Sequence, residues 1–265
     1  MDVSPVASLD DPRVEAYRHL ADPQYLASHG LFVAEGRLVL RRLVASPGWL
    51  TRSILVTQAA LDSLGTALDG VAAPVYVVDQ PVMNDIAGFN IHRGCLALAE
   101  RPPVRSLDAA RLSGVSRVVV LEGVNNPDNV GGIFRSAAAF GVELVVLGPN
   151  CGDPLYRKAV RTSMAATLAV PYARASAWPS DLAAMRSAGF DVIALTPADA
   201  AAPLHEWSVR APRVALMVGA EGEGLSPAAL GEATCRARIP MTGGVDSLNV
   251  TTAASIAMYH WFGLH

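Results

Sequence analysis

Apolar residues in the second half of the chain recur in two alternating patterns from about residue 117 onward. Short, β-rich runs predict strands at Arg117–Leu121, Glu143–Leu147, Thr167–Val170, Asp191–Leu195, Val214–Val218 and Cys235–Ile239. Helical spacing of apolar residues predicts helices at Gly131–Phe140, Arg157–Ser163, Pro179–Ala188, Pro227–Gly231 and Leu248–Gly263. Because strands that alternate with helices favour a mostly parallel sheet covered on both faces, this half is predicted to be an α/β domain.

The first 100 residues show a shorter version of the same pattern. Apolar stripes predict helices at Asp11–Ala21, Glu35–Ala45, Ala59–Leu68 and Val82–Ala87. Short β-rich runs predict strands at Ile54–Val56, Val75–Val78 and Cys95–Ala99. Pro102 and Pro103 then lack amide donors and favour extended backbone, as in a linker. We therefore expect a small α/β domain at 1–100, a linker at 101–115 and a second domain at 116–265.

The segment from Arg238 to Tyr259 changes character twice over a short distance. A strand-like run ends at Met241, and Ser247 and Asn249 then place side-chain oxygens where a helix needs an N-cap. Apolar residues follow at positions 250, 253, 254, 257, 258 and 261, which is a helical stripe. A helix start presents free N–H groups that suit carboxylates and phosphates. The pattern alone fits a ligand site and a capped helix packed on a core equally well.

Composition narrows the class of protein. Hydrophobic residues make up 51% of the 265 residues and charged residues 17%, which indicates a folded globular chain. No apolar run approaches the roughly 20 residues that a membrane span needs, and the acidic N-terminus does not look like a signal peptide, so we expect a cytoplasmic protein. Cys95, Cys151 and Cys235 show neither a zinc spacing nor a disulfide framework. The net charge of −3 excludes a generally basic nucleic-acid binder, although a local arginine patch is enough to hold phosphates.

Three short motifs follow one another in the second half. The first, Asn-Pro-x-Asn-x-Gly-x-x-x-Arg, spans Asn126–Arg135, and the second, Gly-x-Glu-x-x-Gly, spans Gly219–Gly224. The third is Ile239–Met241 followed by Ser-Leu-Asn-Val-Thr at Ser247–Thr251. Together they resemble the SpoU (TrmH-like) family of RNA ribose 2′-O-methyltransferases, of the SPOUT class, over about residues 116–265. Thr251 departs from the family's usual serine but keeps the hydroxyl.

The resemblance implies several properties that the pattern of residues does not give by itself. It implies a C-terminal trefoil knot, the cofactor S-adenosylmethionine, an RNA substrate and a homodimer. The substrate is expected to be ribosomal RNA more than transfer RNA. A looser match at Phe32–Gly36 and His92–Ala97 resembles the L30e-like, RNA-holding domain that is common in this family.

The motif positions supply the expected catalytic residues, which are Arg135, Asn129, Glu221, Ser247 and Asn249. In the family proposal the arginine acts on the 2′-hydroxyl. Because a guanidinium rarely loses its proton, Arg135 is better suited to bind phosphate and stabilise the developing alkoxide, and an ordinary surface ion pair is the alternative. Asn129 holds the ribose or caps a helix. Glu221 fixes Arg135 or the motif loops, or is an exposed turn carboxylate. Ser247 and Asn249 contact the nucleotide or cap the last helix.

A pocket for the cofactor needs backbone groups for the adenine edge and apolar contacts for its faces. The expected cofactor-binding residues are Thr196, Gly219, Ile239, Met241 and Leu248, although Ile239 and Leu248 also suit a plain core. The expected RNA-binding arginines are Arg37, Arg41, Arg93, Arg157 and Arg161. Arg157 and Arg161 belong to the densest basic run, which suits a phosphate track or a solvated helix face. No metal is expected, because a sulfonium donor needs none and the six histidines are dispersed.

Two other functions suit parts of the sequence. A nucleotide-binding oxidoreductase shows the same alternation of strands and helices. It is disfavoured because no Gly-x-Gly-x-x-Gly follows a strand with an acidic residue about 20 positions further on. A non-catalytic RNA-binding protein on the same fold is the alternative, and the intact Asn129, Arg135, Glu221 and Asn249 argue against it.

Overall fold

The structure is a computed structural model that describes residues 2–207, 212–242, 244 and 246–263. The chain forms two compact units, Met1–Pro103 with Pro154–Leu168, and Val104–Asp153 with Ala169–His265. The change at Pro103 falls inside the expected linker. Residues 154–168 differ from the expected division, because they pack with the N-terminal unit. Leu155, Ala159 and Val160 are buried, and the helix at Arg157–Thr162 contacts an edge strand of that unit.

The N-terminal unit is built on a five-stranded sheet. Its order is β1-β4-β3-β5-β2, with β1 at Val3–Pro5, β4 at Val75–Val77, β3 at Thr51–Val56, β5 at Cys95–Glu100 and β2 at Leu31–Glu35. β5 runs antiparallel to both of its neighbours. The helices are η1 (Pro12–His19), α1 (Pro23–Ser28), α2 (Arg37–Val44), α3 (Gln58–Leu64), η2 (Gly65–Leu68), α4 (Gln80–Ala87), α7 (Arg157–Thr162) and η3 (Ala166–Leu168). The mixture of strands and helices confirms an α/β fold for this half.

Two predicted helices of the N-terminal unit differ from the observed elements in a way that has a local cause. Glu35 ends strand β2 instead of opening a helix, because Gly36 has a φ of 102° and interrupts the helical path before Arg37. The predicted helix at Asp11–Ala21 is the 3₁₀ helix η1, which Asp11 caps by accepting a hydrogen bond from the Arg13 amide at 2.9 Å. In both places local backbone conformation outweighs the apolar stripe.

The second unit contains a seven-stranded sheet in the order β10-β12-β9-β11-β6-β7-β8, in which every pair is parallel. The strands are β6 (Arg117–Leu121), β7 (Leu144–Leu147), β8 (Tyr172–Arg174), β9 (Phe190–Leu195), β10 (Ala202–Pro203), β11 (Arg213–Val218) and β12 (Cys235–Arg238). The helices are α5 (Ala109–Ser113), α6 (Pro127–Ala139), α8 (Ser180–Ser187), η4 (Leu204–Glu206), α9 (Pro227–Gly231) and α10 (Val250–Phe262). The predicted parallel α/β sheet is therefore confirmed.

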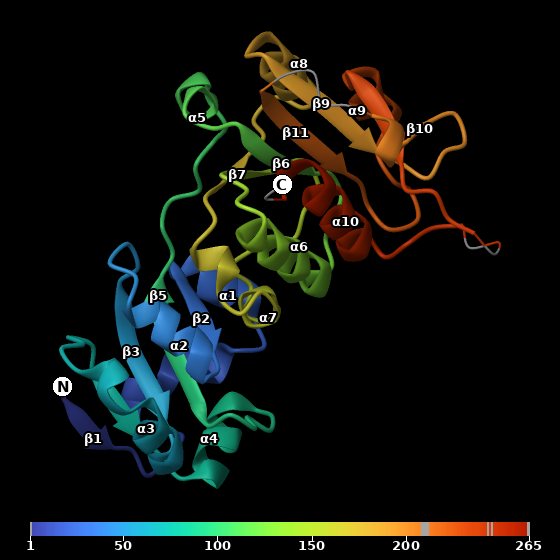
Figure 1. Cartoon of the computed structure of the whole chain (residues 1–265). Helices are drawn as coiled ribbons and strands as arrows, with labels where there is room; N and C mark the ends of the chain where they lie inside the picture. The colour runs from blue at the N-terminus through green and yellow to red at the C-terminus, as the bar shows by residue number, and fades with distance from the viewer. Residues whose placement is uncertain (1, 208–211, 243, 245, 264–265) are drawn as a thin grey trace. The chain divides into compact units, whose positions relative to one another are not determined.

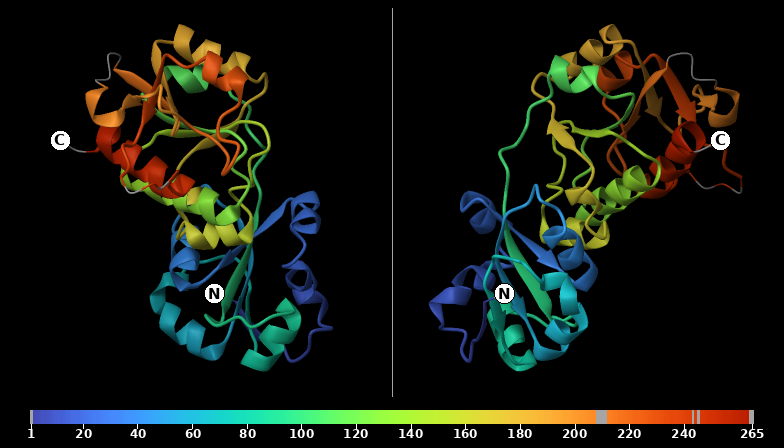
Figure 2. Two further views of the ribbon diagram at one scale, coloured as in Figure 1. Left: turned by 90° about the vertical axis from the view of Figure 1, so that its right-hand side faces the viewer. Right: turned by 60° about the vertical axis from the view of Figure 1, so that its left-hand side comes forward.

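Helices cover both faces of this sheet. Helices α5, α8 and α9 lie on one face, and α6 and α10 lie side by side on the other (Figures 1 and 2). Val118 and Val120 of β6 point into a core with Leu182 and Met185 of α8. Val119 and Leu121, the alternate residues of the central strand β6, are equally buried and point to the α6–α10 face, because side chains alternate along a strand. This arrangement sets the start of α10 beside the carboxyl ends of the central strands.

Two predicted elements of the second half are corrected by the structure. The strand expected at Thr167–Val170 is instead the short 3₁₀ turn η3, and the strand lies later, at Tyr172–Arg174. Thr167 bonds back to the Ser163 hydroxyl through its amide at 3.4 Å, and such local bonds compete with a ladder. Helix α6 begins at Pro127 and not at Gly131. Asn126 caps it by accepting from the Asp128 amide at 2.9 Å, and proline is favoured in the first helical turn.

Cys95 is buried, whereas Cys151 and Cys235 are half-buried, and all three carry free thiols. Burial raises the pKa of Cys95 to about 11 and that of Cys235 to about 12. At neutral pH these thiols are therefore protonated and poor nucleophiles. Among the described residues, no helix is long and apolar enough to cross a bilayer.

Candidate functional site

A pocket of about 430 Å³ opens where β9 and β11 end at the carboxyl edge of the larger sheet. In open parallel sheets this edge is the usual place for a ligand. The pocket is lined by Leu195, Thr196, Pro197, Val218, Gly219, Ala220, Glu221, Gly222, Gly224, Ile239, Met241, Ser247, Leu248, Asn249, Val250 and Ala253. All five expected cofactor-binding residues and three of the five expected catalytic ones therefore share one cavity.

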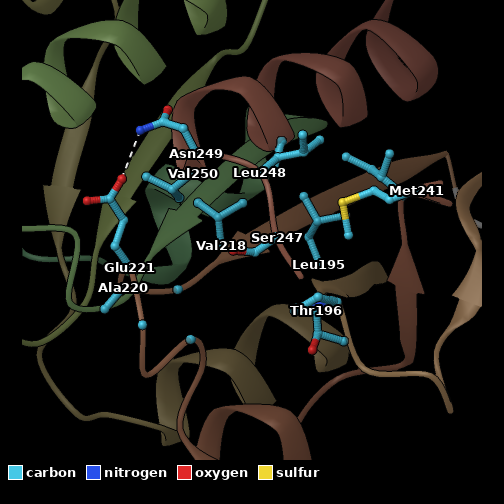
Figure 3. Close-up of a pocket in the computed structure, with 16 residues that line it drawn as sticks. Leu195, Thr196, Val218, Ala220, Glu221, Met241, Ser247, Leu248, Asn249 and Val250 are labelled. Atoms are coloured by element: carbon cyan, nitrogen blue, oxygen red, sulfur yellow. Dashed lines mark hydrogen bonds between the residues drawn. The ribbon is translucent and has the colours of Figure 1, made fainter. Parts of the chain in front are cut away.

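Asn249 ties the three motifs together at one side of this pocket. Its Oδ1 caps α10 by accepting from the amides of Thr251 at 2.9 Å and Thr252 at 3.4 Å. Its Nδ2 donates to Oε1 of Glu221 at 2.8 Å and to Oδ1 of Asn129 at 3.1 Å. Figure 3 shows Asn249 and Glu221 joined on one side of the pocket and Met241 on the other. One amide side chain thus caps a helix and links both other motifs.

Asn129 does not cap α6, which corrects one of its two expected roles. It lies inside the first turns of that helix and is buried, with 6% of its surface exposed. Besides accepting from Asn249, its Oδ1 accepts from the Thr251 hydroxyl at 3.3 Å. The hydroxyl that Thr251 shares with serine is thus part of the network, and the extra methyl group is accommodated. The buried Asn129 orients the start of α10.

The second motif forms a tight turn that gives the pocket a backbone wall. Ala220 and Gly224 exchange two backbone hydrogen bonds, at 3.2 and 3.0 Å. Gly222 and Gly224 have φ values of 87° and 71°, which L side chains rarely adopt. A Cβ added at Gly219 would lie 2.2 Å from the carbonyl carbon of Gly224, so only glycine fits there. Glu221 points from this turn toward Asn249 and not toward a guanidinium of the described chain.

Arg135 lies apart from the pocket wall. Its side chain is exposed on α6, and no described residue accepts a hydrogen bond from it or forms an ion pair with it. The alternative expectation of a surface ion pair is therefore not found among the described residues. The next residue, Ser136, bonds through its hydroxyl to the Ser255 hydroxyl of α10 at 2.7 Å, which fixes this part of α6 against α10. Arg135 is thus carried by an anchored helix with its guanidinium open to solvent.

Glu221 is the only charged side chain among the described residues that line the pocket. Ser247 is exposed at the pocket, and no described hydrogen bond involves its hydroxyl. The remaining wall is backbone, small polar groups and apolar side chains, which include Leu195, Val218, Ile239, Leu248 and Ala253. Leu195 and Val218 were expected only as strand residues. Their places at the last positions of two predicted strands were the available signal for a role in the pocket.

The arginines expected to bind RNA all belong to the N-terminal unit. Nη1 of Arg157 forms an ion pair with the buried carboxylate of Glu35, and Nη1 of Arg161 lies 3.2 Å from its other oxygen. Arg93 lies against Gly36, where an added Cβ would stand 3.3 Å from its Cδ and Nη1. The exposed Arg37 opens α2 next to Gly36. Four arginines from three separate segments therefore gather around Glu35 and Gly36.

Arg41 and Arg42 instead serve the packing of the same unit. Arg41 donates to the Ser63 carbonyl oxygen at 2.7 Å, and Arg42 donates to that of Met164 at 2.6 Å. Arg42 thus fastens the segment 154–168 to α2. Within the described ranges, no group of three or more His, Cys, Asp or Glu side chains could hold a metal ion.

Comparison with known proteins adds family evidence to this geometry. Residues 116–259 match the model of the SpoU rRNA Methylase family. An uncharacterized tRNA/rRNA methyltransferase of Mycobacterium tuberculosis is 45% identical, over 98% of this chain and 91% of that protein. A 23S rRNA (guanosine(2553)-2′-O)-methyltransferase of Bacillus subtilis is 24% identical, over 97% and 99%. The crystal structure of an AdoMet-bound rRNA methyltransferase from Sinorhizobium meliloti matches with a TM-score of 0.80, 26% identity and 97% coverage of both chains.

Proposed function

The chain belongs to the SpoU rRNA Methylase family, and we propose that it transfers a methyl group from S-adenosylmethionine to a ribose 2′-hydroxyl of structured RNA. The observation that carries the proposal is the meeting of three motifs at one pocket, through the contacts of Asn249 with Glu221 and Asn129. Relatives named as ribosomal RNA methyltransferases favour ribosomal RNA over transfer RNA as the substrate. Either RNA would be met in the cytoplasm, where we expect the protein to act.

The pocket fits the proposed cofactor in size and chemistry. Its volume of about 430 Å³ lies in the range of roughly 300–1,000 Å³ that holds cofactor-sized ligands. Ile239 and Leu248 offer apolar contacts for an adenine ring, and the turn at Gly219–Gly224 offers backbone N–H and C=O groups for its edge. Glu221 gives this end of the pocket a negative charge that favours a cation. When bound, S-adenosylmethionine would supply a methyl group on a positively charged sulfur.

The chain's own residues then have to orient the sugar hydroxyl and hold its developing charge. Both hydrogens of the Asn249 NH₂ group are taken by Glu221 and Asn129, so Asn249 would act on the nucleotide by holding the start of α10 in place, while the hydroxyl of Ser247 would position the ribose. Arg135 has no competing partner among the described residues and would bind the neighbouring phosphate. A guanidinium there stabilises an alkoxide electrostatically without losing its own proton. This role agrees better with the chemistry of arginine than that of a general base does.

Several finer features belong to the same proposal. The C-terminal segment would thread through a loop as the trefoil knot of the SPOUT class, and the N-terminal unit would be the L30e-like domain that holds RNA. The arginines around Glu35 and Gly36 would contact phosphates, because a fork of N–H donors suits them. Losing such contacts would reduce the dependence of RNA affinity on salt by about one unit of slope for each arginine.

A homodimer is the proposed assembly. Ile256 and Tyr259 of α10 are 39% and 59% exposed, and Phe140 at the end of α6 meets the Tyr259 ring edge-on at 5.9 Å. An apolar patch of this kind on paired helices suits an interface between copies. Multi-angle light scattering at micromolar concentration should give the mass of a dimer, and Ile256→Arg should shift it toward that of a monomer. A wild-type monomer at these concentrations would contradict the assembly.

Two measurements test the function against its alternative, a non-catalytic RNA-binding protein. Wild-type protein should bind S-adenosylmethionine in calorimetry and transfer labelled methyl to cellular RNA. Arg135→Ala should lose methyl transfer by about 100-fold or more and keep its cofactor affinity, since Arg135 lies outside the pocket wall. Cofactor binding without transfer to any cellular RNA would instead favour the non-catalytic alternative.

A further inference from the structure

We infer that Glu122 is a positioning residue that sets the affinity for the cofactor by clamping both ends of the turn at Gly219–Gly224. The inference rests on the proposed function only for the identity of the ligand. Glu122 lies outside the three motifs and does not line the pocket. It stands one residue beyond β6, with 9% of its surface exposed.

The backbone of Glu122 fixes the beginning of the turn. Its amide donates to the Val218 carbonyl oxygen at 3.0 Å, one step past the regular β6–β11 pairing, which ends with Val218 opposite Leu121. The following residue, Gly123, has a φ of 69°, and a Cβ added there would stand 3.0 Å from Cβ of Ala220. The chain after β6 therefore lies directly against the turn that walls the pocket.

The side chain of Glu122 fixes the end of the same turn. Its Oε2 accepts from the Ser226 amide at 2.8 Å, and its Oε1 accepts from the Ser226 hydroxyl at 2.7 Å. Ser226 in turn caps α9 by accepting from the Ala229 amide at 3.1 Å. A third donor, Nε1 of Trp178, reaches Oε1 at 2.7 Å. One buried carboxylate thus accepts from three donors. Two of them belong to Ser226, just after the turn, and the third belongs to Trp178.

This division of donors predicts what each substitution does. In Glu122→Gln, one oxygen becomes an NH₂ group. In place of Oε2 it faces the Ser226 amide, and in place of Oε1 it faces both the Ser226 hydroxyl and the Trp178 N–H, so a donor of Ser226 loses its acceptor in either orientation. When the turn keeps the form that lines the pocket in only a fraction of the molecules, the apparent affinity for the cofactor is reduced in proportion to that fraction. Bound cofactor restores the turn, so the rate at saturation should change little.

The matched control is Trp178→Phe, which removes the donor outside the turn and leaves both Ser226 contacts intact. Glu122→Gln should raise the Kd and KM for S-adenosylmethionine about ten-fold, with kcat and the KM for RNA within about two-fold of wild type. Trp178→Phe should lower the melting temperature without changing that Kd. Ser226→Ala, which keeps the amide donor, should raise the Kd about three-fold.

Hydrogen exchange of the ligand-free protein separates this inference from the proposed function. Peptides covering residues 219–226 should exchange faster in Glu122→Gln and Ser226→Ala than in wild type, and should be unchanged in Trp178→Phe. Equal exchange in all variants, or a lowered melting temperature in Glu122→Gln with unchanged Kd, would overturn the inference. If Glu122→Gln does not fold, the inference would be overturned by a Ser226→Ala protein whose hydrogen exchange and Kd equal those of wild type. Failure of the wild type to bind S-adenosylmethionine would contradict the proposed function and leave the exchange test decisive for the clamp.

Discussion

Nδ2 of Asn249 lies 3.1 Å from Oδ1 of Asn129, although 120 residues separate them in the chain. The same nitrogen reaches Glu221 at 2.8 Å, so a carboxylate and an amide oxygen share one NH₂ group. The oxygen of the Asn249 amide caps α10, and both hydrogens of its NH₂ group are donated. A carboxylate such as aspartate could cap the helix but would lose both donated hydrogen bonds. The network therefore requires asparagine at this position.

Substitution of Asn249 should separate the cap from the link between motifs. Asn249→Ala removes both, and should lower the free energy of unfolding by about 1–2 kcal/mol. Asn249→Ser keeps an oxygen that can cap α10 but lacks the Nδ2 donor to Glu221 and Asn129. It should stay within about 0.5 kcal/mol of wild type while methyl transfer falls at least about ten-fold. Chemical denaturation and transfer of labelled methyl measure the two effects. Full activity in Asn249→Ser would show that the link is dispensable.

The spacing of α6 and α10 depends on the absence of a side chain at Gly132. A Cβ there would stand 2.6 Å from Cγ2 and 3.1 Å from Oγ1 of Thr251. Gly132→Ala should therefore destabilise the protein by about 1–2 kcal/mol, even though alanine favours helices by about 1 kcal/mol over glycine. Thr251→Ser removes the nearer atom and keeps the hydroxyl, so Gly132→Ala with Thr251→Ser should regain at least half of the loss. Additive effects in this double-mutant cycle would contradict the contact.

The pair between Glu35 and Arg157 should hold residues 154–168 on the N-terminal unit. The side chains of Glu35 and Arg157 are 7% and 17% exposed, so Glu35→Gln leaves a guanidinium largely buried without its counter-charge. We expect the free energy of opening this segment to fall by about 2–3 kcal/mol. This is less than for a fully buried pair, because Arg161, the second partner of Glu35, is half-buried. Hydrogen exchange of peptides within 154–168 measures this free energy.

The matched control for Glu35 is Glu100, whose partner Arg52 is 61% exposed. Glu100→Gln should change stability by less than about 1 kcal/mol, as usual for surface pairs. Unchanged protection of residues 154–168 in Glu35→Gln would mean that apolar packing alone holds the segment.

Glu143 should make stability depend on pH in the acid range. Burial alone would raise its pKa, but hydrogen bonds from the amides of Ser116 and Arg117 and from the Ser116 hydroxyl outweigh burial and hold the pKa below its ordinary value. A lowered pKa stabilises the fold above the unfolded value of about 4.3, and that stability is lost as the pH falls through the folded pKa. Wild type should exceed Glu143→Gln in free energy of unfolding at pH 7, and the difference should narrow below about pH 4. A difference independent of pH would refute this assignment.

The sequence predicted the parallel sheet of the second unit well, because buried parallel strands read as continuous apolar runs. Arg117–Leu121 has the predicted bounds. The sequence did not predict that residues 154–168 join the N-terminal unit. Glu35 pairs with Arg157 across 122 positions, and no local pattern indicates such a contact. It also did not show whether Asn129 caps a helix, because Asn126 stands three residues earlier and is an equally good cap.

The candidate site, too, was predicted from the sequence only in part. Gly219, Ile239, Met241 and Leu248 of the motifs line the pocket as expected, and so does Thr196, which lies outside the motifs. Their binding of cofactor stays a prediction. Glu122 left no signal in the motifs, because its role depends on Ser226 and Trp178, which reach it from distant loops. Contacts of this kind are set by tertiary packing and not by local spacing.

We propose above that this pocket directs methyl transfer to a sugar hydroxyl. The most direct measurement incubates the protein with S-adenosylmethionine labelled in its methyl group and with RNA from cells that lack the protein, and then digests the RNA to nucleosides. We predict label in a 2′-O-methylnucleoside, and at least about 100-fold less label with the Arg135→Ala protein. Label on a base, or an RNA that stays unlabelled while the cofactor binds, would contradict it.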